Sequence, residues 1–527
     1  MNRYSILVAD TLGDEGLAIL QDAGDVTVRT GMDEAALRAA LSGFDALVVR
    51  SATRVTAGAL EGADRLAVIG RAGIGVDNID VEAATERGIV VMNTPQAGAT
   101  TTAEHAIALL VSMARHVPAA DAALKAGRWD KKLFTGVEIT GKTFGVVGLG
   151  NIGRIVADRG RGLGMQVIAY DPFVTQERAP EGVRMVSLDE LCAEADFVSI
   201  HVPLLDETRH LFDRARIARM KPGSRLVHAA RGGIVEDEAL ADALESGHLA
   251  GAALDVFELE PLPADHPFRR LANVVLTPHI GASSAEAQKS VALDMARQVV
   301  LALTKGVVLN GVNVPRVAPA EAAALGPYLT LARQLAAFLT ALHDGPLESV
   351  RISLQGGILE RSPHPLTVAA LSGAMAGRGE TPITPVNVER IARERGIRVH
   401  TEAVSLKRDF THLIRVEAVV AGARHHVVGT VLGHRHGRLI EVDGRPVDAI
   451  PEAPLLVTQH RDAPGVLGAI GTALGNLGVN VDRMQLGEPT DSGGPALGIW
   501  NLDRALEPGE LEVLRGLDVL VELVQVR

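Results

Sequence analysis

The stretch TFGVVGLGNIGRIVADRGRGLG, residues 143–164, decides the fold because it joins a predicted strand to a predicted helix through a glycine turn. Gly148, Gly150 and Gly153 form the pattern G-x-G-x-x-G. The pattern alone is weak evidence in a chain with 55 glycines. Between a strand and a helix, however, it allows a tight turn and lets a pyrophosphate approach the free N–H groups of the helix N-terminus. We therefore predict a doubly wound α/β domain that binds a dinucleotide; the alternative is a glycine turn without a ligand.

The next predicted strand, QVIAYDP, ends at Asp171, 18 residues after Gly153. A carboxylate at this place accepts hydrogen bonds from both ribose hydroxyls and repels a 2′-phosphate. The sequence therefore favours NAD over NADP as the cofactor.

Short β-branched runs alternate with alanine-rich helical segments on both sides of this motif. Upstream strands are predicted at SILVAD, VTVRT, ALVVRS, LAVIGRAG and IVVMN, and downstream strands at FVSIHVP, RLVHAA, GAALDV and VVLTPHI. Such alternation is typical of parallel sheets covered by helices. A long helix predicted at about 99–117 joins the two series, and the segment NGVNVPRVAPA, about 310–320, is predicted to be a linker.

The C-terminal part follows a different pattern. Helices and alternating strands are predicted up to about residue 450, followed by a compact βαβ-like unit in the last 75 residues. No charged residue occurs between Gly465 and Asn480, so we expect this helix and strand to be buried on more than one face, against another domain or subunit.

Composition excludes several classes of function. The chain has 527 residues, which suggests three or four domains. A net charge of −12 and 3% aromatic residues argue against nucleic-acid binding. The single cysteine, Cys192, excludes an internal disulfide, and neither a secretory signal nor an 18-residue apolar span is found. We expect a cytoplasmic protein with no nucleic-acid or membrane partner.

Three polar residues follow predicted strands of the dinucleotide domain: Arg231, Glu260 and His279. Each has an ordinary alternative, namely a surface ion pair, a solvated carboxylate and a packed ring. Ligands of doubly wound sheets, however, bind at the carboxyl ends of the strands, so we expect the three side chains to meet there.

Together they supply what is needed to move a hydride between a nicotinamide and C2 of a 2-hydroxy acid. A histidine, with an ordinary pKa of about 6.5, can take the hydroxyl proton, which is the role expected of His279. Glu260 would fix the tautomer of that ring, and Arg231 would bind the substrate carboxylate with two parallel hydrogen bonds. Asp255 is placed to contact the nicotinamide amide, or else has a structural role at its strand end.

The motifs GLGNIGR, ARGGIVEDEAL, ALDVFELEP and TPHIGAS resemble the D-isomer-specific 2-hydroxyacid dehydrogenase family, and within it the long-form phosphoglycerate dehydrogenases, over essentially the whole chain. The resemblance implies a Rossmann-type cofactor domain inserted in a flavodoxin-like substrate domain, followed by two α+β regulatory domains. The implied boundaries are 1–98 with 282–312 for the substrate domain, 99–281 for the NAD domain, 316–450 for an intervening domain and 453–527 for an ACT-type domain. It also implies the catalytic set Arg231, Glu260 and His279, and cofactor contacts at Gly148, Gly150, Asn151, Ile152, Gly153, Asp171, Val202, Ala229, Asp255 and Gly281.

The resemblance further implies NAD-dependent oxidation of D-3-phosphoglycerate to 3-phosphohydroxypyruvate, the first step of phosphorylated serine synthesis. By the same resemblance, five residues are expected to line the substrate cleft: Arg50, Ser51, Gly73, Asn78 and Asn93. For Arg50 and Ser51, charge and a hydroxyl donor at a strand end also suit a phosphate, and an ordinary strand cap is the alternative. Lys131 and Lys132 are expected to add positive charge from a neighbouring subunit.

In the last domain, HRDAPGVLGAIGTALGNLGVNVDRMQLG resembles ACT-type units, which implies feedback inhibition by L-serine and a homodimer or homotetramer. His460, Asp462 and Asn480 match the positions that bind the effector. Asp462 has a second interpretation, as the N-cap of the following helix.

The segments ARHHVV and GHRHGR concentrate histidines in the region before this domain. Zinc sites usually need a further ligand at suitable spacing, so we favour ordinary polar residues on strands and predict no metal. An anion site with Arg445 is a third interpretation.

Two other functions fit the same sequence. One keeps the chemistry but uses glyoxylate, hydroxypyruvate or 2-hydroxyglutarate as the substrate. The other is a non-enzymatic, NAD-sensing corepressor, against which the complete catalytic set argues.

Overall fold

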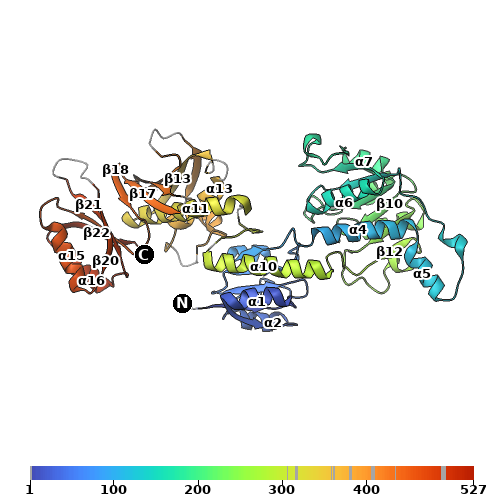
Figure 1. The fold of residues 1–527 in the computed structure, drawn as a ribbon, viewed down its shortest axis with the longest axis horizontal. Coiled ribbons are helices and arrows are strands. Elements are labelled where there is room, and N and C mark those ends of the chain that lie inside the picture. Colours follow the sequence, from blue (N-terminus) through green and yellow to red (C-terminus); the bar gives the residue numbers. More distant parts are fainter. Residues whose placement is uncertain are drawn as a thin grey trace.

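The computed structural model describes residues 3–305, 307–314, 319–357, 359, 363–378, 383–404, 410–433, 435–487 and 494–526. The strands among these residues form four sheets. Figure 1 shows them arranged along an elongated molecule, with the two C-terminal sheets at the end opposite to the cofactor-type sheet.

The first sheet is parallel and has the order β2-β1-β3-β4-β5. Its strands are β1 (Tyr4–Val8), β2 (Gly24–Val28), β3 (Ala46–Val49), β4 (Val68–Arg71) and β5 (Val90–Met92). This is the flavodoxin-like order that was expected. Its helices are α1 (Asp14–Ala23), α2 (Glu34–Leu41), α3 (Val81–Glu86) and, from much later in the chain, α10 (Ala285–Lys305). Residues of α10 complete the hydrophobic core on one face of this sheet, and α10 lies beside α1 (Figure 1).

The second sheet is also parallel, with the order β12-β11-β10-β9-β6-β7-β8. Its strands are β6 (Thr143–Val147), β7 (Gln166–Tyr170), β8 (Val183–Met185), β9 (Phe197–Ile200), β10 (Arg225–His228), β11 (Gly251–Leu254) and β12 (Val274–Leu276). The strand order reverses between β6 and β9, which confirms the doubly wound, Rossmann-type sheet. Its α-helices are α4 (Ala99–Ala114), α5 (Val117–Lys125), α6 (Asn151–Gly162), α7 (Leu188–Glu194), α8 (Arg214–Arg219) and α9 (Asp237–Glu245). Short 3-10 turns occur at η1 (Lys131–Phe134), η2 (Gln176–Arg178) and η3 (Pro267–Arg270).

The prediction of a single helix over 99–117 is wrong at its C-terminal end, because α4 ends at Ala114 and α5 begins at Val117. The chain bends by 64° between α4 and α5. His116 adopts a left-handed conformation with φ of 52°, and Pro118 lies at the first turn of α5. Proline is accommodated at a helix start but not in its interior, so a new helix begins here. No single helix among the described residues is both long and apolar enough to cross a membrane, and α4 with α5 meets those criteria only as this bent pair.

The third sheet is mixed, with the order β14-β13-β15-β16-β17-β18. Its strands are β13 (Leu347–Gln355), β14 (Arg398–Ala403), β15 (Leu413–Val420), β16 (Ala423–Leu432), β17 (His436–Val442) and β18 (Arg445–Ala449). The accompanying helices are α11 (Pro319–Leu342), α13 (Pro363–Ala374) and α14 (Val388–Glu394). The predicted linker is partly ordered, because Val312 and Asn313 hydrogen-bond to Val91 of β5; residues 315–318 lie outside the described residues.

The last unit is a βαββαβ fold rather than a single βαβ. Its sheet is antiparallel with the order β20-β21-β19-β22, formed by β19 (Leu455–His460), β20 (Val481–Gly487), β21 (Ala496–Leu502) and β22 (Leu520–Val526). Helices α15 (Val466–Asn476) and α16 (Pro508–Arg515) connect the strands. These two sheets confirm the expected α+β class. Within the chain, the uncharged helix α15 is buried on one face only, because Gly468, Ala469, Thr472 and Gly475 are not buried.

Candidate active site

The glycine turn lies between β6 and α6, where the sheet reverses its strand order. Gly148 has φ of +94°, a conformation that favours glycine, and a Cβ there would lie 2.9 Å from the His201 oxygen and from a methyl of Val202. A Cβ on Gly153 would collide with the Gly148 carbonyl oxygen, so α6 packs directly on the turn. Gly150, in contrast, faces open space at the N-terminus of α6. The turn thus has the close packing and the open side that a pyrophosphate site requires.

Asp171 follows β7 and joins this turn to the neighbouring strand. Its Oδ2 accepts the Leu149 N–H at 2.8 Å, and its Oδ1 accepts the Phe173 N–H at 2.9 Å. Each carboxylate oxygen can accept more than one hydrogen bond, so both keep capacity for ribose hydroxyls. Of the other predicted cofactor residues, Val202 contacts the turn and Asn151 donates to the Pro95 oxygen at 3.4 Å. Ile152 is half-buried, while Ala229 is buried directly after β10.

His279 and Glu260 form a close pair at the carboxyl edge of the same sheet. The distance from His279 Nδ1 to Glu260 Oε2 is 2.6 Å. Partial burial disfavours ionisation of Glu260, but the hydrogen bond and charge of His279, the Phe257 N–H and the charge of Arg231 outweigh it and lower the pKa of Glu260. The carboxylate is therefore ionised at neutral pH and is placed to stabilise a proton on the ring. Because Nδ1 is engaged, Nε2 of His279 is the nitrogen free to exchange a proton with a ligand.

Asp255 holds the turn that carries His279. This carboxylate is 1% exposed, and it accepts the Thr277 hydroxyl at 2.6 Å, the Ile280 N–H at 2.9 Å and the Gly281 N–H at 2.8 Å. His279 itself has φ of 52°, an uncommon conformation for a residue with a side chain. The two backbone hydrogen bonds immediately after it keep the chain in this conformation. Of the two alternatives for Asp255, these contacts support the structural one.

Arg231 extends from the end of β10 towards the first sheet. Its Nε donates to Asp77 Oδ2 at 2.8 Å, and its Nη1 donates to the Ala230 oxygen at 2.7 Å. A Cβ on Gly75 would collide with the guanidinium, so this group lies directly against the backbone of the loop after β4. Since the charge of Arg231 also reaches Glu260, the guanidinium lies between the catalytic pair and the first sheet.

A cluster of arginines lies at the carboxyl ends of β3 and β4. The pKa of Arg71 is lowered to about 10, mainly by burial and then by the positive charge of Arg231. The charge of Arg50 lowers it further, while the carboxylates of Asp77 and Asp10 raise it. Nε of Arg71 is buried and has no hydrogen-bond partner among the described residues. The charges of Arg50 and Arg231 both reach Arg71, and guanidiniums gathered in this way suit an anionic ligand. Arg71 was not among the predicted residues, although it lies at the end of its strand much as Arg50 does.

The other predicted substrate residues mostly hold the loops around this arginine cluster. Asn78 donates to the oxygens of Arg50 and Thr53 at 2.7 and 2.6 Å, and Asn93 donates to the Ile74 oxygen at 2.5 Å. Both amides therefore hold the loops that carry the arginines. Gly73 has φ of +152°, and Ser51 is exposed beside Arg50.

Comparisons with known proteins agree with this geometry. Residues 107–281 match the model of the NAD binding domain of D-isomer specific 2-hydroxyacid dehydrogenases, and residues 324–443 match the D-3-phosphoglycerate dehydrogenase intervening domain. D-3-phosphoglycerate dehydrogenase of Methanocaldococcus jannaschii is 40% identical over 97% of this chain and 97% of its own. The chain belongs to the D-3-phosphoglycerate dehydrogenase family. The Synechocystis sp. enzyme of the same name is also 40% identical, over 96% of this chain and 91% of its own. A crystal structure of a Thermus thermophilus protein, 38% identical, covers 58% of this chain and 99% of its own with a TM-score of 0.54.

This member of the D-3-phosphoglycerate dehydrogenase family carries His460 and Asp462 before the start of α15, whereas Asn480 lies after the end of that helix, directly before β20 and at the other end of the sheet. His460 is 3% exposed and lies 3.2 Å from the Thr458 hydroxyl, so its ring is inside the unit. Burial is the main cause that lowers the pKa of His460. Asp462 and Asn480 are exposed, and Asn480 donates to Asp482 at 2.8 Å. The N-cap of α15 is Gly465, so the interpretation of Asp462 as the helix cap is wrong.

Asp255→Asn is expected to lower turnover by about 10- to 100-fold and the free energy of unfolding by about 1–3 kcal/mol, because an amide nitrogen cannot accept the Gly281 or Ile280 N–H. Turnover, thermal unfolding and NADH affinity of the variant measure this. Asp265→Asn, in the exposed loop after Glu260, is the matched control and should leave all three unchanged. A loss of NADH affinity with normal turnover would instead favour a cofactor contact for Asp255.

Proposed function

We propose that this chain oxidises the C2 hydroxyl of D-3-phosphoglycerate to the ketone of 3-phosphohydroxypyruvate, with NAD⁺ as the oxidant. The observation that carries the proposal is the 2.6 Å contact between His279 and Glu260 beside the guanidinium of Arg231, at the sheet edge that also carries the glycine turn. The roles given to single residues are part of the proposal.

The dinucleotide fits the residues present, because Gly150 leaves open space at the N-terminus of α6 and Asp171 keeps acceptor capacity at the end of β7. When bound, NAD⁺ supplies the two-electron acceptor for the reaction. The protein's task is to orient the substrate and to remove its hydroxyl proton. Nε2 of His279 takes that proton, and the ionised Glu260 stabilises the imidazolium through Nδ1.

The substrate has two anionic ends, and the site has two sources of positive charge. Arg231 is the arginine whose charge reaches the catalytic pair, so it is assigned to the carboxylate next to C2. Arg50 and Arg71, on the loops of the first sheet, are assigned to the distal phosphate. The ion pair of Arg231 with Asp77 then has to be exchanged for the substrate carboxylate.

Incubating the purified chain with NAD⁺ and 3-phosphoglycerate at alkaline pH, with a trap for the keto product, should generate NADH. Specificity constants for glyoxylate, hydroxypyruvate and 2-oxoglutarate, measured with NADH, test the related substrates. The absence of turnover with all of these, in a protein that still binds NADH, would contradict the proposal and favour a cofactor-sensing role.

Arg71→Gln is expected to raise KM for 3-phosphoglycerate at least about tenfold, because one charge-assisted hydrogen bond to an anion is worth about 1.5–3 kcal/mol. KM for NAD⁺ should not change. Glycerate, which lacks the phosphate, serves as the internal control, since its specificity constant should fall much less. An equal loss with both substrates would place Arg71 at the carboxylate instead.

Glu260→Gln is expected to shift the pH profiles in both directions of reaction. The pKa of Glu260 is lowered, so its negative charge is present at neutral pH. Glutamine keeps a similar shape but removes the charge that stabilises the protonated ring. Oxidation, which needs the neutral ring, should reach its plateau at lower pH, and reduction should decline at lower pH. The pH dependence of kcat/KM, measured for oxidation and for reduction, tests this prediction. Profiles identical to those of the original chain would show that another group controls the pH dependence.

We also propose that L-serine is an effector of the last unit and that the chain works as a homo-oligomer. Asp462, before the start of α15, and Asn480, after its end, are exposed and suit an ammonium and a carboxylate. Because they lie at opposite ends of the helix, an effector that contacts both has to bind between two copies of the unit. Two exposed surfaces support association: the uncharged face of α15, and the segment after α5 where Trp129 is 77% and Leu133 67% exposed. Mass measurement in solution with and without serine, together with turnover at increasing serine, tests both proposals.

A further inference from the structure

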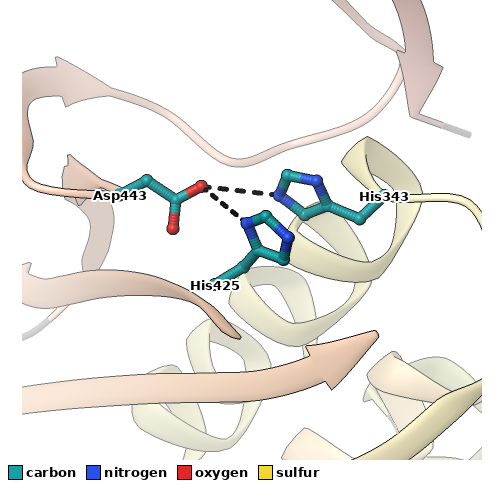
Figure 2. Close-up of side chains that lie close together, drawn as sticks. All are labelled: His343, His425 and Asp443. Atoms are coloured by element: carbon teal, nitrogen blue, oxygen red, sulfur yellow. Dashed lines mark hydrogen bonds and ion pairs between the residues drawn. The ribbon is translucent and has the colours of Figure 1, made fainter. Parts of the chain in front are cut away.

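A second cluster of polar groups lies in the region between the third and fourth sheets. It consists of His343, directly after α11; His425, on β16; and Asp443, between β17 and β18. All three residues fall within the segment that matches the intervening-domain model. Figure 2 shows the two imidazole rings side by side, each with a nitrogen directed at the same carboxylate oxygen. The distances to Asp443 Oδ2 are 3.5 Å from His343 Nε2 and 3.2 Å from His425 Nδ1.

We propose that His343, His425 and Asp443 form a binding site for a divalent transition-metal ion of the zinc class. One potential ligand atom from each residue lies within 4.8 Å of the others. The rings are stacked, with centroids 3.4 Å apart and an interplanar angle of 15°, and one nitrogen of each lies near Asp443 Oδ2. Because a metal ion binds an imidazole nitrogen in the plane of the ring, one ring has to turn out of the stack for both to bind the same ion. Two imidazoles and one carboxylate are ligands that zinc and its neighbours prefer.

The hydrogen bonds within the cluster leave one nitrogen unused. Nε2 of His343 is buried and makes no hydrogen bond among the described residues, although it faces the carboxylate. Oδ2 has lone pairs for an N–H from each ring, but the His343 contact, at 3.5 Å, is long for a hydrogen bond. A metal ion would bind all three atoms at about 2.0–2.2 Å once the rings have turned towards it.

The carboxylate is held in place for this role. Asp443 has φ of 45° and is followed by Gly444 with φ of 83°, the conformation of an Asp-Gly hairpin turn. Its other oxygen, Oδ1, accepts the His426 N–H at 2.7 Å, which leaves Oδ2 directed at the two rings. Fixed outer contacts of this kind are typical of metal sites because they orient the ligand before the ion binds.

Three protein ligands leave a coordination position for water, and the structure provides space for it. A cavity of about 310 Å³ adjoins the cluster and is lined by His343, Asp443 and Arg445 together with Gln459 and Glu522 of the fourth sheet. Arg445 is the cation in this lining, and its guanidinium donates to the Pro495 oxygen at 3.3 Å. The predicted absence of a metal rested on two histidine segments, of which only the first contributes a ligand, His425; His434 lies outside the described residues.

Zinc titration of the full-length, untagged chain after treatment with EDTA tests the site, with a chromophoric chelator as competitor. We expect one Zn²⁺ per chain, and affinities at least about 100-fold weaker for His343→Gln and His425→Gln. Asp443→Asn keeps the turn and an acceptor for the His426 N–H, so its loss of affinity reports the ligand and not the fold. His400→Gln, on the exposed edge strand β14 of the same sheet, is the matched control and should bind as the original chain does.

Co²⁺ provides a readout that does not depend on affinity alone. Ligand-field bands in the visible spectrum should appear with the original chain and with His400→Gln, and should be lost in the double variant His343→Gln/His425→Gln. Circular dichroism and thermal unfolding without metal check that each variant is folded. Zinc uptake by the double variant equal to that of the original chain, or an unchanged Co²⁺ spectrum, would overturn the proposal.

Discussion

His279→Ala should lower kcat for oxidation by about 10²- to 10⁴-fold, the usual contribution of a positioned general base. The ring is the group whose free nitrogen can take the hydroxyl proton, because Nδ1 is bound to Glu260 at 2.6 Å. Alanine removes this proton acceptor but leaves the glycine turn, the arginines and Asp255 in place. We therefore expect the loss in kcat, with little change in NADH affinity.

Steady-state turnover and NADH fluorescence titration measure the two effects separately. His436→Ala replaces an exposed histidine on β17, in a different sheet from the site, and is the matched control. Partial recovery of His279→Ala by added imidazole would support proton transfer as the missing step. A fall in kcat of less than about fivefold would mean that another group is the base.

Much of this site follows from the sequence because parallel sheets obey simple rules. The carboxyl ends of β10, β11 and β12 lie at one edge, so residues that follow these strands in the sequence must come close together. Arg231, Glu260 and His279 were predicted on that ground, and the structure brings them together. The short strand Val90–Met92 could also be predicted, because its β-branched run is followed directly by Asn93.

Other features depend on contacts that no local pattern reports. The sequence left two roles open for Asp255, a cofactor contact or a structural one, and only the structure shows that its oxygens accept hydrogen bonds from the Thr277–Gly281 turn. Arg71 was overlooked because one arginine at a strand end is common until the charges of Arg50 and Arg231 are placed around it. His343 lies 82 residues before His425 in the sequence, and only the packing of α11 against the third sheet brings the two rings together.

Arg231→Ala should lower kcat/KM at least about 100-fold, because it removes two charge-assisted hydrogen bonds to the substrate carboxylate, each worth about 1.5–3 kcal/mol. Arg231→Lys should lose roughly 10- to 150-fold: an ammonium keeps the charge but cannot form two parallel hydrogen bonds. Both losses should appear mainly in the kinetic constants for the hydroxy acid, with KM for NAD⁺ nearly constant. Kinetics with each substrate varied in turn separate these effects.

Asp77→Asn distinguishes substrate binding from a structural role of Arg231. In the structure, Asp77 accepts a hydrogen bond from Nε of Arg231 at 2.8 Å. It therefore competes with the substrate carboxylate for one of the guanidinium donors. If Arg231 binds substrate, removing this competing charge should leave KM for the hydroxy acid unchanged or lower. If the ion pair instead serves only to join the two sheets, Asp77→Asn should reproduce the losses of Arg231→Ala, and the role assigned to Arg231 would have to be abandoned.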